Sequence, residues 1–335
     1  MAGKEFDASK TTFYIESLIN FNMRRLPYFI LMSFLFYNCI HEKNSTDFET
    51  ITKDDTWRQS ITTGKFVQLS KGYTYYEFSN PQADTILVLV HGFSVPSYIW
   101  DSTFYDATQH GYATLRYDNF GRGNSDNPDA IYDVNLFANQ LGELLDTLQI
   151  NKPITLLGLS DGGRTISAFA AQSPARIQNL VYVDAAGFET LETNQEHPAA
   201  ISEKEVLDFK DSERYRNMAK GQLSDFYDST RFRGWDKKYG SLMKSRGFVR
   251  ALLSTLKNRT PLQEEHHKIA EAKLPVYAIW GEHDTVVILN NVRDNLTSLL
   301  PEAKLFVIPQ AGHLPHMEQA KLFQEILFEK ILRKK

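Results

Sequence analysis

The sequence predicts an α/β fold: a mainly parallel sheet with helices on both faces and a helical insertion over one edge. Short apolar, β-branched runs alternate with amphipathic stretches, as expected for repeated strand–helix units. The run 85–90 is apolar throughout, which is typical of a strand that is buried on both faces. Between about residues 188 and 271 no strand pattern occurs, whereas helical periods recur.

The first two predicted strands, 66–69 and 73–78, form a hairpin across Ser70-Lys71-Gly72. The later strands are expected at 85–90, 113–117, 154–157, 180–183, 276–280 and 305–308. The helices are expected at 98–109, 134–148, 162–172, 289–300 and 319–332. Because strand and helix alternate, most neighbouring strands must be parallel.

Four segments follow from this pattern. Residues 1–40 are predicted to be a signal or anchor segment and 41–62 a polar tether, while 63–187 and 272–335 form the core around a helical lid at 188–271. A lid inserted between two sheet strands should lie over the strand ends, where open α/β sheets bind their ligands.

The N-terminal segment has the layout of a secretory signal. Met23-Arg24-Arg25-Leu26-Pro27 precedes the apolar run 28–37, and Cys39 follows. The run is shorter than the roughly 20 residues that span a bilayer. It resembles a bacterial lipoprotein signal that starts at Met23, with Cys39 lipidated and the protein exported and membrane-tethered in the cell envelope. An uncleaved anchor, or a helix packed on a cytoplasmic protein, is the alternative.

Composition excludes several classes of function. A single cysteine excludes an intrachain disulfide and a multi-thiolate metal site. The histidines lack metal-ligand spacing, and His266 and His267 are expected on a solvated helix surface, so we expect no metal and no cofactor. A net charge of −4 without a basic run indicates no nucleic-acid partner.

The turn Gly158-Leu159-Ser160-Asp161-Gly162 lies between a predicted strand and a predicted helix. A serine on so tight a turn needs neighbours without Cβ atoms, because strand and helix approach closely around it. The serine then stands exposed at the helix N-terminus, where backbone N–H groups favour developing negative charge. Ser160 is therefore the candidate nucleophile.

A serine nucleophile needs a base and an orienting acid. His313 follows the strand 305–308 and Asp284 follows 276–280, so both are expected at the sheet edge that carries Ser160. Asp184, after 180–183, is a competing acid, and His283 and His316 are competing bases.

The oxyanion donors are expected on the loop after the strand 85–90. There Gly92 allows the chain to bend toward the nucleophile, so the backbone N–H groups of Phe93 and Asp161 are the candidates.

From about residue 66 to 333 the chain resembles the α/β-hydrolase superfamily, specifically its branch of single-lid esterases, meta-cleavage-product hydrolases and proline iminopeptidases. The resemblance rests on His91-Gly92-Phe93, the segment 118–125, the Ser160 turn, Gly281-Glu282-His283-Asp284 and Gly312-His313. It implies the triad Ser160, His313 and Asp284.

Asp161 departs from the methionine that is frequent after the nucleophile in this branch. The serine–aspartate pair resembles that of relatives of valacyclovir hydrolase, in which the carboxylate faces a substrate amino group. The alternative is that Asp161 caps the helix 162–172. Lid aromatics such as Trp235 suggest an apolar substrate pocket, or plain core.

These observations predict a serine hydrolase that cleaves a small ester through an acyl-enzyme. C–C bond hydrolysis, aminopeptidase action and cofactor-free peroxidation on the same fold are the nearest alternatives, because one fold hosts many reactions. A non-catalytic protein that binds a small ligand under the lid is the alternative from another class.

Overall fold

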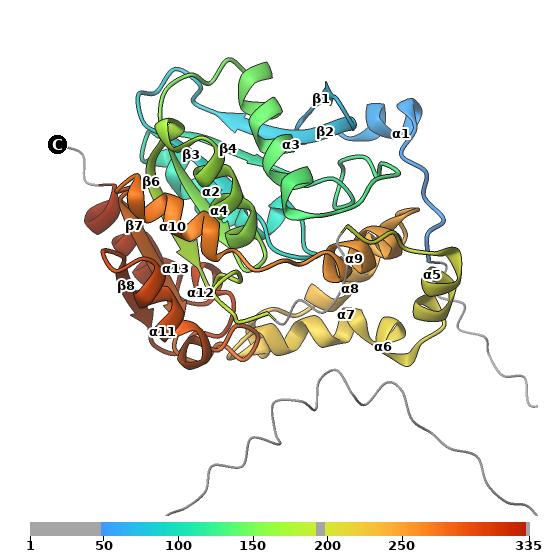
Figure 1. The fold of residues 1–335 in the computed structure, drawn as a ribbon. Helices are drawn as coiled ribbons and strands as arrows, with labels where there is room; N and C mark the ends of the chain where they lie inside the picture. The colour runs from blue at the N-terminus through green and yellow to red at the C-terminus, as the bar shows by residue number, and fades with distance from the viewer. Residues whose placement is uncertain (1–47, 192–197, 333–335) are drawn as a thin grey trace, which may run out of the picture. The chain divides into compact units, whose positions relative to one another are not determined.

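One sheet of eight strands lies at the centre of the part of the chain that the computed structural model describes, residues 48–191 and 198–332 (Figure 1). The strands are β1 (Lys65–Leu69), β2 (Gly72–Ser79), β3 (Ile86–Val90), β4 (Ala113–Tyr117), β5 (Ile154–Leu159), β6 (Ile177–Val183), β7 (Val276–Gly281) and β8 (Lys304–Ile308). Across the sheet they are ordered β1-β2-β4-β3-β5-β6-β7-β8. The hairpin β1–β2 and the pair β2–β4 are antiparallel, and all other pairs are parallel, which confirms the predicted mainly parallel sheet.

Both faces of the sheet are buried because alternate side chains of each central strand enter different layers. In β3, Ile86, Val88 and Val90 pack into one hydrophobic cluster, whereas Leu87 and Leu89 pack into the other. The first cluster includes residues of α3 (Val134–Thr147), α4 (Gly162–Gln172), α10 (Gln263–Glu271) and α11 (Leu289–Leu299). The second includes residues of α2 (Asp101–Gln109), α13 (Ala320–Gln324) and the π-helical turn η8 (Glu325–Ile331). Each fully buried side chain of this kind contributes about 2 kcal/mol to stability.

The insertion over the strand ends is helical, as its sequence predicts. It contains α5 (Glu203–Lys210), α6 (Glu213–Arg216), α7 (Met218–Gly221), α8 (Trp235–Leu242) and α9 (Phe248–Lys257), with the 3₁₀ turns η6 (Gln222–Asp225) and η7 (Ser229–Arg231). These helices lie at the lower right in the view of Figure 1.

The C-terminal boundary of the lid differs from the predicted residue 271. Helix α10 packs on α4 in the core layer, where the His266 ring stacks on Phe188 at 4.4 Å and its Nε2 lies 3.1 Å from the Ser167 hydroxyl. His266 is fully buried, so its predicted place on a solvated surface is wrong. The polar residues around it cover the opposite, exposed side of the helix.

The described part of the predicted tether, residues 48–62, packs on the domain; we call it the N-terminal strap. On the lid side, the Ile51 N–H donates to Lys244 O at 2.8 Å and the Arg246 N–H donates to Ile51 O at 2.9 Å. On the core side, Lys53 Nζ donates to Asn127 Oδ1 at 3.0 Å.

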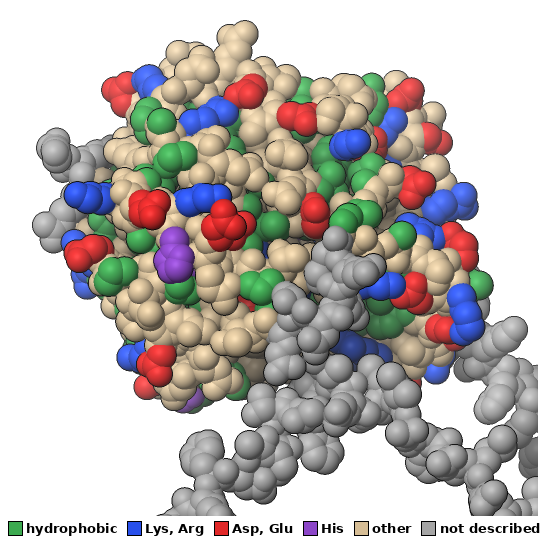
Figure 2. All heavy atoms as spheres, in the orientation of Figure 1, with side chains coloured by type: hydrophobic (Ala, Val, Ile, Leu, Met, Phe, Trp, Pro, Cys, Tyr) green, Lys and Arg blue, Asp and Glu red, His purple; other side chains and the backbone are tan. Residues whose placement is uncertain are grey.

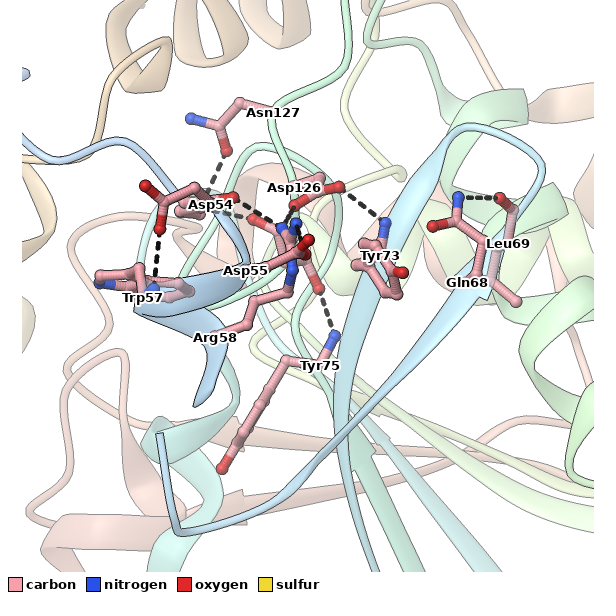
Figure 3. A network of polar contacts seen from close by, with 12 residues as sticks. Asp54, Asp55, Trp57, Arg58, Gln68, Leu69, Tyr73, Tyr75, Asp126 and Asn127 are labelled. Atoms are coloured by element: carbon pink, nitrogen blue, oxygen red, sulfur yellow. Dashed lines mark hydrogen bonds and ion pairs between the residues drawn. The ribbon is translucent and has the colours of Figure 1, made fainter. Parts of the chain in front are cut away.

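The strap ends in the short helix α1 (Asp55–Ser60), which docks beside the β1–β2 hairpin (Figure 3). Asp54 caps this helix by accepting from the Trp57 N–H at 2.8 Å, and Arg58 forms an ion pair of 3.0 Å with Asp126. The predicted tether is therefore ordered structure from residue 48 onward.

The predicted signal segment 1–40 and its Cys39 lie outside the described residues. Among the helices that are described, none combines the length and the apolarity needed to cross a membrane.

Candidate active site

The carboxyl ends of β5, β6, β7 and β8 meet at one edge, because these four strands are parallel neighbours. Ser160 directly follows β5, Asp284 lies on the loop after β7 and His313 on the loop after β8. The topology thus places all three predicted catalytic residues at the same edge of the sheet, under the lid.

The Ser160 turn is tight and strained. Ser160 has a φ of +52°, a left-handed conformation that costs free energy in a residue with a Cβ. The turn is fixed because the Ser160 N–H donates to Val183 O at 3.0 Å, while Ser160 O accepts from the N–H groups of Gly163 and Ala186 at 2.8 and 2.9 Å. The flanking glycine is required: a Cβ on Gly158 would lie 2.6 Å from Gly162 O.

His313 and Asp284 form a buried hydrogen-bonded pair. His313 Nδ1 lies 2.9 Å from Asp284 Oδ2, and each residue is about 5% exposed. Asp284 is itself held in place, since its Oδ1 accepts from the N–H groups of Val286 and Val287 at 2.8 and 3.0 Å. Burial by itself lowers the pKa of His313, but the charge and hydrogen bond of Asp284 outweigh it and raise that pKa above its ordinary value.

This geometry assigns the roles of the two ring nitrogens. Because Nδ1–H donates to the Asp284 carboxylate, the neutral ring keeps its lone pair on Nε2, where a base must hold it. The Ser160 hydroxyl makes no hydrogen bond to a described residue; in such sites the serine–histidine bond often tightens only with substrate.

The predicted oxyanion loop passes beside the nucleophile. A Cβ on Gly92 would lie 3.0 Å from the Ser160 Cβ, so a larger residue would push the nucleophile by a few tenths of an ångström. The loop is fixed from behind, because the buried Arg122 donates from Nε to Phe93 O at 2.7 Å. In the described part of the chain, the N–H groups of Phe93 and Asp161 donate to no protein acceptor, as an oxyanion hole requires.

His91 sets the conformation of the same loop. Its Nε2 accepts from the Asn119 N–H at 2.9 Å, so its Nδ1–H donates to Gly92 O at 2.8 Å. Complete burial lowers the pKa of His91 to about 3 and keeps the ring neutral.

Ser160 opens into a cavity of about 440 Å³ between the sheet edge and the lid. The lid contributes Phe209, Met218, Leu252 and Leu256 to its wall, and the loop after β7 contributes Val286 to Ile288. Ligand sites are commonly of this size and mostly apolar. A hollow of about 640 Å³ beside the N-terminal strap contains none of the three catalytic candidates.

Asp161 has a partner that the sequence did not reveal. Its Oδ1 forms an ion pair of 2.8 Å with Arg259, which comes from the segment after α9 and also lines the cavity. The Asp161 side chain makes no capping bond to α4, so the alternative prediction of a helix cap is wrong. The carboxylate beside the nucleophile is thus largely neutralised within the protein.

The competing histidines lie elsewhere. His283 is about half exposed and stacks on Tyr227 at 4.5 Å. His316 is buried, with Nε2 hydrogen-bonded to Ile99 O at 2.9 Å, and burial lowers its pKa to about 3. Neither ring is paired with Asp284.

Trp235, a predicted substrate contact, is buried among lid aromatics. Its ring lies edge-on to Tyr98 at 5.8 Å and to Phe226 at 5.6 Å, and it is not among the described residues that line the cavity. The competing acid Asp184 is also buried, and one oxygen of its carboxyl lies within 4.8 Å of Asp284 and His313. In the chain as described, these three side chains are the group that could share a cation, but hydrogen bonds within the protein already occupy most of their ligand atoms.

Two curated proteins are similar to this chain over most of its length. It is 27% identical to Lipase 1 of Psychrobacter immobilis over 88% of this chain and 93% of the lipase. It is likewise 27% identical to a putative 2-succinyl-6-hydroxy-2,4-cyclohexadiene-1-carboxylate synthase of Bacillus subtilis, over 74% of this chain and 91% of that protein.

Solved structures share the fold. A bromoperoxidase from Bacillus anthracis superposes with a TM-score of 0.67 at 21% identity, covering 81% of this chain and all of that one. A thermophilic esterase from Thermogutta terrifontis gives a TM-score of 0.64 at 19% identity, over 81% of this chain and 98% of the esterase. The family model of the alpha/beta hydrolase fold matches residues 85–320, and the chain therefore belongs to the α/β-hydrolase family.

Proposed function

We propose that this hydrolase cleaves a small carboxylic ester through an acyl-enzyme, with Ser160 as nucleophile, His313 as base and Asp284 as the orienting acid. The observation that carries the proposal is the buried 2.9 Å bond between His313 and Asp284, at the sheet edge that presents the strained Ser160 turn. A base that is oriented by an acid beside an exposed serine turn is the arrangement that acyl transfer needs.

In the first half-reaction, His313 Nε2 takes the Ser160 proton while Oγ attacks the ester carbonyl. The Phe93 and Asp161 N–H groups stabilise the oxyanion, and each donor is worth about 3 kcal/mol of barrier. His313 then gives its proton to the departing alkoxide, which leaves as the alcohol. Water then attacks the acyl-enzyme while His313 Nε2 takes its proton. The carboxylic acid leaves as His313 returns this proton to Ser160 Oγ.

The cavity favours an uncharged substrate with an apolar body. Its described wall is mainly aliphatic and aromatic, and the charge of Asp161 beside the nucleophile is paired with Arg259. A neutral ester therefore avoids the cost of burying an unpaired charge. The similarity to two bacterial lipases, Lipase 1 and Lipase 3, also supports ester chemistry.

The test is hydrolysis of p-nitrophenyl acetate by the purified protein and by Ser160→Ala. We expect Ser160→Ala and His313→Ala to lose turnover by about 10⁴-fold or more, because removal of a triad member has effects of this size. The matched control is His283→Ala, a half-exposed histidine on the loop of Asp284, which should keep wild-type turnover.

Labelling with a fluorophosphonate probe separates catalysis from simple binding. The wild type should be labelled at Ser160 and Ser160→Ala should not. A folded Ser160→Ala protein with undiminished turnover would show that the nucleophile lies elsewhere. If the labelled wild type cleaved no ester or amide but cleaved the C–C bond of a vinylogous diketone, the triad would be assigned to C–C bond hydrolysis instead.

A further inference from the structure

A second buried aspartate lies behind the catalytic pair, and the mechanism above does not use it. Asp184 directly follows β6, the strand between β5 and β7, and is fully buried. It has a φ of +42°, a conformation that aspartate tolerates better than most residues, although at some cost. The chain therefore keeps an acidic side chain, in a strained conformation, at the edge where Ser160, Asp284 and His313 meet.

The contacts of Asp184 are one-sided. Its Oδ1 accepts from the Gly281 N–H at 2.8 Å, whereas its Oδ2 is buried without a hydrogen bond to any described residue. One carboxyl oxygen lies within 4.8 Å of both an Asp284 oxygen and a His313 ring nitrogen. Because Oδ2 has no hydrogen bond to a described residue, the carboxyl must move closer before this oxygen can bond to either partner.

Two carboxylates this close in a buried site cannot both be ionised at low cost. Asp284 is the charged one, because it accepts two backbone hydrogen bonds and pairs with His313. Burial first, and the Asp284 charge second, raise the pKa of Asp184 well above its ordinary value. A neutral Asp184 has one proton, which can be donated toward Asp284.

Two other acids near His313 are differently placed. Glu318 is buried and uses both carboxylate oxygens, since it accepts from Gly312 N–H at 2.7 Å and Asp228 N–H at 3.0 Å. Asp225 belongs to the lid turn η6, and burial raises its pKa to about 6, with the Asp284 charge adding to the rise and the His313 charge opposing it. Of these three described acids, Asp184 is the one that directly follows a sheet strand and lies in the group with Asp284 and His313.

Resting on the proposed function, we propose that Asp184 is a positioning residue that supports Asp284 as a neutral acid and becomes the ionised partner of His313 when Asp284 loses its charge. In the wild type the proton stays on Asp184 and one negative charge faces the imidazole. In Asp284→Asn the repulsion is gone, Asp184 loses its proton to solvent, and its carboxylate rotates toward Nδ1–H. Asp184, after β6, is thus a reserve acid beside Asp284, which follows the neighbouring strand β7.

The experiment is a double-mutant cycle on kcat/KM for p-nitrophenyl acetate with Asp284→Asn, Asp184→Asn and the double variant. Because Asp184 must shift to reach His313, we expect Asp284→Asn to lose about 10²-fold, the cost of a misplacement near 1 Å. The double variant, with no acid left for His313, should lose about 10⁴-fold. Asp184→Asn alone should lose far less than Asp284→Asn, since the amide also donates toward Asp284. The matched control is Asp225→Asn, which replaces the lid acid. In combination with Asp284→Asn, the two losses of kcat/KM should simply multiply, and the activity that remains in Asp284→Asn should not be abolished.

A second readout does not depend on turnover or on the folding of Asp184→Asn. The infrared carbonyl band of a buried protonated carboxylic acid should be present in the wild type at neutral pH and disappear in Asp284→Asn, as Asp184 ionises. Asp284→Asn as inactive as the double variant, or a band that persists in it, would overturn the reserve-acid role. Loss of the residual activity by Asp225→Asn would assign the role to the lid acid instead. Full activity of Ser160→Ala would refute the proposed function itself, a result that the acid variants do not produce.

Discussion

Gly162 is where the first turn of α4 passes the strand end that leads into the oxyanion loop. A Cβ at this position would lie 2.6 Å from both Val90 O and His91 O, whereas real Cβ atoms essentially never come within 3.0 Å of another heavy atom. Gly162→Ala must therefore push the backbone apart by about 0.5 Å, because packed interiors transmit strain instead of absorbing it. The chain that moves continues directly into Gly92 and Phe93.

Two terms of opposite sign determine the loss of stability. Overpacking costs about 1–3 kcal/mol, and the higher helix propensity of alanine returns up to about 1 kcal/mol. We expect the free energy of unfolding to fall by about 1–2 kcal/mol. Because a misplacement of 1 Å costs about 10²-fold, a shift of half that size should lower kcat/KM about tenfold.

Urea denaturation and p-nitrophenyl acetate kinetics measure both effects. The control is Gly142→Ala in α3, whose Cβ would meet Phe169 at 3.7 Å, an ordinary contact. This variant should gain about 0.5–1 kcal/mol of stability from helix propensity and keep its kcat/KM. A Gly162→Ala protein with wild-type stability and wild-type kcat/KM would refute the steric argument.

Three further predictions follow from the site and the N-terminus. The neutral form of His313 accepts the serine proton, so kcat/KM should fall as the pH drops through its raised pKa; we expect the acid limb above pH 6.5, and the double variant Asp184→Asn/Asp284→Asn, which leaves no carboxylate for His313, should move it lower. Since Asp161 is paired with Arg259, the wild type should hydrolyse α-amino and neutral p-nitrophenyl esters within about tenfold of each other, and a preference of 10²-fold for the amino ester would show that substrate displaces Arg259. Mass spectrometry of the mature protein should find a lipidated N-terminal Cys39, and an unmodified Met1 would remove the lipoprotein hypothesis.

The sequence predicted the parts of this fold that depend on short patterns. Continuous apolar runs such as 85–90 gave the central strands, because a strand buried on both faces is mainly apolar. The Ser160 turn was predictable because steric demand is local: glycine is needed where strand and helix touch. The proximity of His313 and Asp284 was predictable because each follows a parallel strand, and the carboxyl ends of parallel strands lie at the same edge of the sheet.

Contacts between residues that are far apart in the sequence and belong to no motif could not be predicted. Arg259 meets Asp161 across 98 residues, and nothing in the residues around Arg259 distinguishes it from a surface arginine. The strap was missed for the same reason, because Ile51 and Lys53 lie in a polar stretch whose partners, on the lid and on the loop of Asn127 respectively, are distant in sequence. The sequence pattern makes Asp184 a competitor of Asp284, whereas the structure brings both aspartates to the same histidine.

The N-terminal strap has a consequence for the order in which the protein is assembled. The Glu49 carboxylate accepts from the Val249 N–H at 3.0 Å, a contact between residues 200 positions apart. A chain that emerges from the ribosome at about 5–20 residues per second exposes the strap at least ten seconds before its docking surface exists. The β1–β2 hairpin beside α1 can pair meanwhile, but the strap must wait for Met243 and Lys244. Among the described residues, the first to be synthesised are thus among the last to reach their final contacts. A factor that binds them during synthesis would therefore delay docking of the strap on the lid without hindering formation of the sheet.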